Sequence, residues 1–307
     1  MNEIERCVGI NVTASRLQFV EVEKELNQLL ISNIGQTFIS PPLNFDDQVE
    51  ANIQNQLQTA FDEIKIRNPV TSTFASFTLP PELFITIQLP YDANLNQNEI
   101  REEFNWEISQ LFPYISIDEL AIKFYELGSD FLPGKNNALV IALNKKYLIQ
   151  IKNFCSRNNL IPRLVDSSSI TANSFINKNT SNVKESITIN IFDSRNSITL
   201  FINVSSKPGF VKVFLKRDNG IINSLISELL QDKFKEVLNK PFTKAVVSGD
   251  DLRTDSLSEL QIATGLEFRK FNPFDVIKFK SEIQDHEFSS EQFSSFTSAT
   301  GIASRFS

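Results

Sequence analysis

The sequence is poor in glycine, cysteine and histidine. Its 307 residues include 9 glycines, where average usage of about 7% would give roughly 21. The two cysteines, Cys7 and Cys155, lie in unrelated segments without metal-ligand spacing, so we expect two reduced thiols packed as small apolar residues. His286 is the single histidine, which argues against the common zinc sites and against Ser-His-Asp or Cys-His catalysis.

Long apolar runs and an excess of basic residues are also missing. No run approaches the ~18 apolar residues of a transmembrane helix, and the stretch from Met1 to Cys7 has no apolar signal-peptide core. The net charge is −7, which argues against a general nucleic-acid binder and against attraction to anionic lipids. The sequence therefore predicts a cytoplasmic protein that reaches a membrane only through a partner.

Strand and helix patterns alternate along the chain, in two halves that each begin with three strands and a helix. In the first helix, apolar residues recur every three or four positions and form one stripe. We expect strands at 6–12, 17–23, 29–34, 72–78, 83–88, 121–127, 138–143, 163–166, 186–192, 198–204, 210–215, 244–248 and 267–271. We expect helices at 49–64, 100–112, 145–157, 169–177, 220–238, 255–265 and 291–306.

Local signals define several of these boundaries. Asn96 precedes Glu99 by three residues, which predicts a capping box, with Ile100 and Leu111 at the two ends of the helix's apolar face. Pro90 is expected to end the strand before it, and Asn158-Asn159 predicts a C-terminal cap for helix 145–157. The polar stretch 178–184 is interpreted as a linker.

Short motifs in a consistent order resemble one family. The stretch Val8–Ser15 resembles the Gly-Ile-Asp-Ile-Gly-Ser-Ser-Ser strand of actin-like ATPases. Phe104–Glu107 and Leu111–Pro113 resemble a helix of the PilM family of type IV pilus and secretion proteins, and Asn159–Pro162 and Val246–Gly249 resemble its later motifs. These matches span nearly the whole chain in the family's order.

The resemblance implies an α/β fold of the actin-like (ribonuclease H-like) type. Its first core would comprise residues 1–78 and 163–182. An inserted small subdomain of the FtsA/PilM type would comprise 79–162. The second domain would comprise 183–307, with its last helix packing back.

The first nucleotide loop departs from the family pattern. Asn11 stands where the family has an aspartate, and it brings no charge to a hydrated Mg²⁺. Thr13 stands where the family has a glycine, and a β-branched residue suits a tight phosphate turn poorly. Ser15 completes this loop.

The other two nucleotide loops depart as well. In the second loop, Asn190 and Phe192 match the aspartate and glycine of Asp-Ile-Gly, so that a phenylalanine would fill the phosphate position. In the adenosine loop, Ser248 and Gly249 are followed by Asp250, whose carboxylate would repel a phosphate. The resemblance therefore predicts a degenerate site, a pseudo-ATPase rather than an enzyme, and no cofactor. Bound ATP and Mg²⁺ remain the alternative if the loops still bind.

The implied function is that of an assembly scaffold. PilM-like proteins bind the cytoplasmic tail of a PilN-type inner-membrane partner, in a groove between the inserted subdomain and the first core. Trp106, the single tryptophan, lies beside the apolar stripe of its helix and is the candidate partner-binding residue, with a core position as the alternative. A nucleotide-dependent switch, a sugar kinase, an FtsA-like division protein, a GspL-type secretion subunit and self-association stay open.

Overall fold

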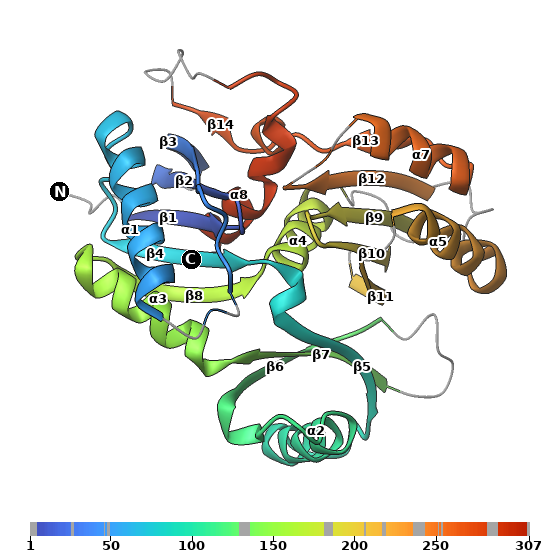
Figure 1. Cartoon of the computed structure of the whole chain (residues 1–307). Coiled ribbons are helices and arrows are strands. Elements are labelled where there is room, and N and C mark those ends of the chain that lie inside the picture. Colours follow the sequence, from blue (N-terminus) through green and yellow to red (C-terminus); the bar gives the residue numbers. More distant parts are fainter. Residues whose placement is uncertain are drawn as a thin grey trace.

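The computed structural model describes residues 5–25, 28–45, 47, 50–128, 136–180, 187–205, 207–216, 219–235, 243–250, 252, 254–280 and 288–305. The described strands form sheets of six, five and three strands (Figure 1). The first sheet has the order β14-β3-β2-β1-β4-β8. Its strands are β1 (Glu5–Val12), β2 (Arg16–Glu25), β3 (Gln28–Phe38), β4 (Phe74–Leu79), β8 (Ile161–Ser167) and β14 (Lys278–Phe279).

Helices cover both faces of the first sheet. Helix α1 (Glu50–Arg67) places the predicted apolar stripe on one face, together with α3 (Lys145–Arg157). Helices α4 (Ser168–Thr180) and α8 (Thr297–Ala303) cover the other face. Because strand side chains alternate, Phe19 packs toward α1 and Val20 packs toward α8.

The second sheet has the order β11-β10-β9-β12-β13. Its strands are β9 (Ile187–Asp193), β10 (Ser197–Val204), β11 (Lys207–Leu215), β12 (Thr243–Gly249) and β13 (Phe268–Lys270). Helices α5 (Asn219–Lys233) and α7 (Thr254–Thr264) bury their apolar side chains on one face. Helix α4 lies on the other face and therefore stands between the two sheets (Figure 1).

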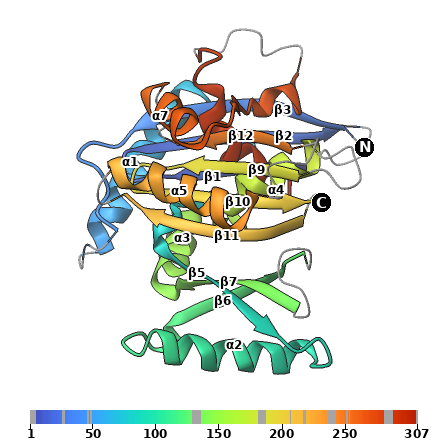
Figure 2. The same ribbon diagram turned by 90° about the vertical axis from the view of Figure 1, so that its right-hand side faces the viewer.

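The third sheet forms a subdomain inserted between β4 and β8. It has the order β5-β7-β6, with β5 (Phe84–Tyr91), β6 (Leu120–Glu126) and β7 (Asn136–Asn144). Helix α2 (Gln97–Leu111) packs on the far side of this sheet, away from the two larger sheets (Figure 2). Along β7, Ala138 and Val140 face α2, whereas Leu139 and Ile141 face α4 and the second sheet.

Boundary signals in the subdomain are mostly confirmed. Asn96 and Glu99 form the predicted capping box. Two expectations are wrong. Leu111 is 54% exposed instead of packing on the apolar face. Strand β5 runs through Pro90 to Tyr91, because an edge strand tolerates a residue that lacks an N–H group.

The chain returns to the first sheet after β13. Strand β14 pairs with β3 and was not predicted, because two residues carry no readable pattern. The helix expected at 291–306 is a 3-10 turn, Phe293–Phe296, followed by α8. Residues 273–280 and 288–303 thus pack against the first core, within the range predicted as the second domain.

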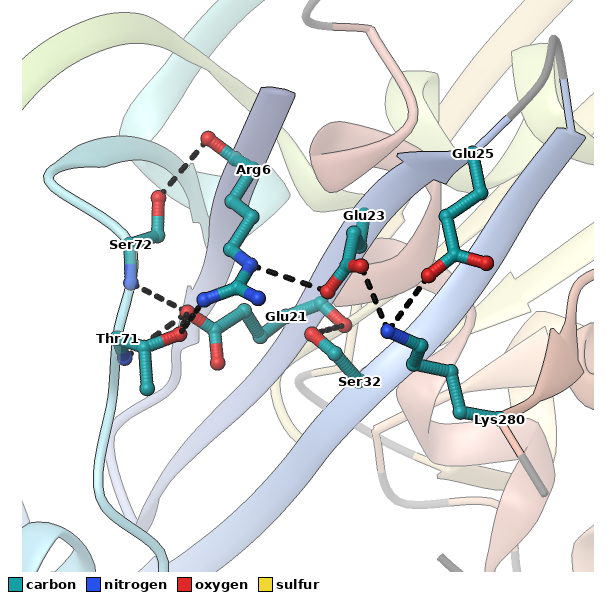
Figure 3. A network of polar contacts seen from close by, with 8 residues as sticks. All are labelled: Arg6, Glu21, Glu23, Glu25, Ser32, Thr71, Ser72 and Lys280. Carbon is teal, nitrogen blue, oxygen red and sulfur yellow. Dashed lines mark hydrogen bonds and ion pairs between the residues drawn. The ribbon is translucent and has the colours of Figure 1, made fainter. Parts of the chain in front are cut away.

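A polar network fastens this returning segment (Figure 3). Lys280 Nζ donates to Glu23 Oε1 at 2.6 Å and pairs with Glu25 at 2.7 Å. Arg6 Nε donates to the other oxygen of Glu23 at 3.0 Å. The carboxylate of Glu21 beside it accepts hydrogen bonds from the loop before β4. Burying Glu23 is tolerated because cations contact both of its oxygens.

Candidate functional site

The turns that follow β1, β9 and β12 meet in the cleft between the first and second sheets. A cavity of about 150 Å³ lies there, and its lining includes Thr13, Ser15 and Asp250 of the predicted nucleotide loops. Arg16, Glu82 and Arg195 line the same cavity. Glu82 accepts hydrogen bonds from Asn196 and Ser197, which joins the entrance of the inserted subdomain to the second domain.

A hydrogen bond between Asn11 and Asp250 joins the first and second domains beside this cavity. Asn11 Nδ2 donates to Asp250 Oδ1 at 2.8 Å, and both residues are buried. The same amide nitrogen donates to Gln18 at 3.2 Å, and the amide oxygen accepts from the Thr78 hydroxyl at 2.8 Å. The amide therefore binds side chains of the chain itself through both of its atoms.

Gly249 allows strands β12 and β9 to approach each other closely. Its φ is +155°, and an added Cβ would lie 1.9 Å from the carbonyl oxygen of Asp193 on β9. The residue before it, Ser248, is buried, and its hydroxyl has no hydrogen-bond partner among the described residues. The glycine lets β12 end against β9, and the Asp193 side chain there pairs with Lys216.

A second, larger cavity of about 520 Å³ lies at the junction of the inserted subdomain, α4 and the second sheet. Leu139, Ile170 and Phe201 supply apolar lining from these three parts. Asn177 is 2% exposed, and its Nδ2 has no hydrogen-bond partner among the described residues. Lys178 adds a positive charge.

A buried carboxylate organises one wall of this junction. Asp166, at the end of β8, accepts from Tyr125 Oη at 2.8 Å and from Arg305 Nη1 at 2.7 Å. Burial and the neighbouring Asp166 carboxylate raise the pKa of Tyr125, so its hydroxyl stays protonated and donates. Asp166 thus links the inserted subdomain, the first core and the residues after α8.

The comparisons with known proteins agree with this architecture. The sequence profile described as "Type IV pilus assembly protein PilM" matches residues 9–216. The chain belongs to the PilM family. A solved PilM-PilN type IV pilus biogenesis complex contains a chain that is 18% identical, with a TM-score of 0.73, over 97% of this chain and 98% of that one.

A more distant structure shares the fold. A Bacteroides thetaiotaomicron protein with an actin-like ATPase fold and unknown function is 11% identical, with a TM-score of 0.54, over 86% of this chain and 90% of that chain. No curated protein sequence was found to match. The actin-like fold expected from the sequence is therefore confirmed.

Asn190 and Phe192, which were aligned with the PilM-family phosphate loop, do not line the cavity between the sheets. Asn190 points to α4, where Nδ2 donates to Asn173 at 2.8 Å and to Asn177 at 3.0 Å. Phe192 shares that face of β9 by strand alternation and is 2% exposed. The 150 Å³ cavity lies past the end of β9, so neither side chain lines it. The expectation that Phe192 fills a phosphate position is therefore wrong.

Trp106 lies outside the groove proposed for a PilM-type tail. It is 60% exposed on α2, so the alternative of a core position is wrong. The three-stranded sheet separates α2 from α4 and the junction cavity (Figures 1 and 2). Sequence reasoning missed the junction residues Tyr125, Asp166 and Arg305, because their proximity depends on three segments distant in the chain.

Within the described ranges, no helix is both long and apolar enough to span a membrane. No group of three or more potential metal ligands gathers in that part of the chain. Burial raises the pKa of Cys155 to about 12 and also raises that of Cys7, so neither thiol is activated as a nucleophile.

Proposed function

We propose that this protein is a cytoplasmic scaffold that binds the tail of a PilN-type inner-membrane protein without hydrolysing ATP. The observation that carries the proposal is the Asn11–Asp250 hydrogen bond across the cleft. In this family the same strand position holds the aspartate that would face a Mg²⁺ water shell. Here an amide takes its place and is saturated by side chains of the chain itself.

The size and charge of the cleft support the absence of hydrolysis. Small-molecule and cofactor sites usually measure about 300–1,000 Å³, whereas this cavity measures about 150 Å³. Admitting ATP would require breaking the Asn11–Asp250 bond, which would turn the Asp250 carboxylate toward the phosphates. Arg16 and Arg195 at the cavity are balanced by the carboxylates of Glu82 and Asp250, so the lining offers no net positive charge to the phosphates.

The junction cavity is the better candidate for tail binding. Its volume of about 520 Å³ accommodates a few side chains. Leu139, Ile170 and Phe201 offer apolar contacts to an anchoring residue. Asn177 Nδ2 offers a donor to a peptide carbonyl, and burying that carbonyl would satisfy both groups. The PilM-PilN complex, whose PilM-type fold this chain shares, supports a partner of this kind.

Titration calorimetry tests both parts on the full chain. The first titrant is ATP with Mg²⁺, and the second is a synthetic peptide of the cytoplasmic segment of the PilN-type protein from the same organism. We expect no heat from millimolar ATP and saturable heat from the peptide. Micromolar ATP binding would refute the closed cleft and support a nucleotide-dependent switch.

Filling the junction cavity with a large side chain tests whether the peptide binds there. Ser174 lines the junction cavity from the exposed side of α4, so Ser174→Trp should block the cavity without disturbing the core. Ser224→Trp on α5 is the matched control, because it adds the same bulk to an exposed helix position of the second domain. Peptide binding should fall at least tenfold in Ser174→Trp and stay unchanged in Ser224→Trp. Equal loss in both variants would remove the junction cavity from the proposal.

A further inference from the structure

Large apolar side chains are exposed on α2 and just after its C-terminal end. Trp106 is 60% exposed, Leu111 is 54% exposed and Tyr114 is 98% exposed. Ile100 and Phe104 face the subdomain core, and Trp106 lies on the opposite side of the helix, whereas Leu111 extends the core face beyond the sheet. The exposed side chain of Trp106 therefore contributes nothing to the subdomain core. Exposed aromatic residues mark interaction surfaces.

The same helix carries unpaired negative charge next to the tryptophan. Glu102 and Glu103 lie four and three residues before Trp106 on the helix, which places them on its side. Neither forms an ion pair within the described part of the chain, and neither does Glu107.

We propose that this α2 surface, composed of Glu102, Glu103 and Trp106, binds a lysine- or arginine-rich segment of a second protein. A cation over the Trp106 ring gains cation–π attraction, and the adjacent glutamates pair with further cations. Aliphatic side chains between those cations cover the exposed apolar groups. The negative charge of α2, rather than its exposed apolar area, favours a basic segment as the partner.

This surface is independent of the tail site. Helix α2 and the three-stranded sheet lie between it and the junction cavity (Figure 2). One molecule can therefore hold a membrane-anchored tail on one side of the subdomain and a basic segment on the other. A second copy of this chain fits less well, because its net charge is −7.

The single tryptophan makes the proposal directly testable on the full chain. The probe is a short fluorescein-labelled peptide of alternating lysine and leucine, and the control peptide has glutamate in place of lysine. We expect saturable anisotropy with the lysine peptide, weakening with salt, and no binding of the glutamate peptide. An unlabelled lysine peptide should shift Trp106 emission to shorter wavelength as the indole leaves water.

Variants separate a specific site from general attraction to an acidic protein. Trp106→Ala, and separately the pair Glu102→Gln with Glu103→Gln, should weaken peptide binding about tenfold. Ile262→Ala should change nothing, although Ile262 is 84% exposed on α7. Glu102 and Trp106 are exposed and Glu103 is half-buried, and thermal unfolding verifies that each variant is folded. Equal affinity in wild type and Trp106→Ala would overturn the proposal. A change confined to sedimentation of the protein alone would overturn it in favour of self-association.

Discussion

Replacing Asn11 by aspartate probes the closed cleft most sharply. The substitution restores the residue that the family's nucleotide loop carries and changes one amide into a carboxylate of the same shape. In the closed cleft, that carboxylate lies opposite Asp250 at the 2.8 Å now spanned by a hydrogen bond. The variant also loses the hydrogen bond donated to Gln18.

The size of the effect follows from the geometry. If the two carboxylates relax to about 4 Å, an effective dielectric constant of about 20 gives a repulsion of about 4 kcal/mol. In a chain of this size, that loss lowers the melting temperature by about 8 °C. The loss should shrink at acid pH, because two carboxylates this close share a proton readily.

Differential scanning calorimetry at several pH values measures this loss. Asn98→Asp is the matched control, because Asn98 is exposed on the first turn of α2, and its free energy of unfolding should change by less than about 0.5 kcal/mol. Combining Asn11→Asp with Asp250→Asn puts a donor and an acceptor opposite each other again and should recover most of the loss. An unchanged melting temperature for Asn11→Asp, or full recovery with Mg²⁺ and ATP, would refute a closed cleft.

Three further changes test how the C-terminal segment is held. Burial alone would raise the pKa of Glu23, but hydrogen bonds such as that from Lys280 lower it. The deficit of Lys280→Met, followed by circular dichroism, should therefore be full at neutral pH and shrink as the pH falls through that lowered value. Arg305→Met leaves the buried Asp166 without its guanidinium and should cost about 3 kcal/mol in urea unfolding. Gly9→Ala should unfold at markedly lower temperature, because its methyl group would meet a carbonyl oxygen of α8 at 2.1 Å.

Local patterns predicted most of the elements. Helix α3 begins and ends where the apolar spacing and Asn158-Asn159 indicated, and Asn159 adopts the left-handed φ of 55° expected of a cap. The inserted sheet and both meanders followed from alternation of apolar residues. Strand β14 and the exposure of Leu111 did not, because both depend on which surface a distant segment covers.

The candidate sites were likewise predictable from the sequence only in part. Asn11 and Asp250 were identified from their places in two motifs. Their hydrogen bond joins residues 239 positions apart, and no local pattern encodes how two domains close. The orientation of Asn190 was mistaken because a motif alignment gives a position along a strand but not the packing partner of its side chain. The Asp166 junction left no signal, since isolated tyrosine, aspartate and arginine residues are common.

The position of α8 also sets the order in which the protein can be completed during synthesis. Helix α8 packs on β1, β2, β4 and α4, yet the ribosome delivers it only after the entire second sheet. Domains usually fold as units as they emerge, the N-terminal one first. Here the face of the first sheet that carries Val20, Val22 and Ile34 is covered only in part, by α4, until residue 303 has emerged. The first core therefore stays incompletely packed while the ribosome translates the second domain.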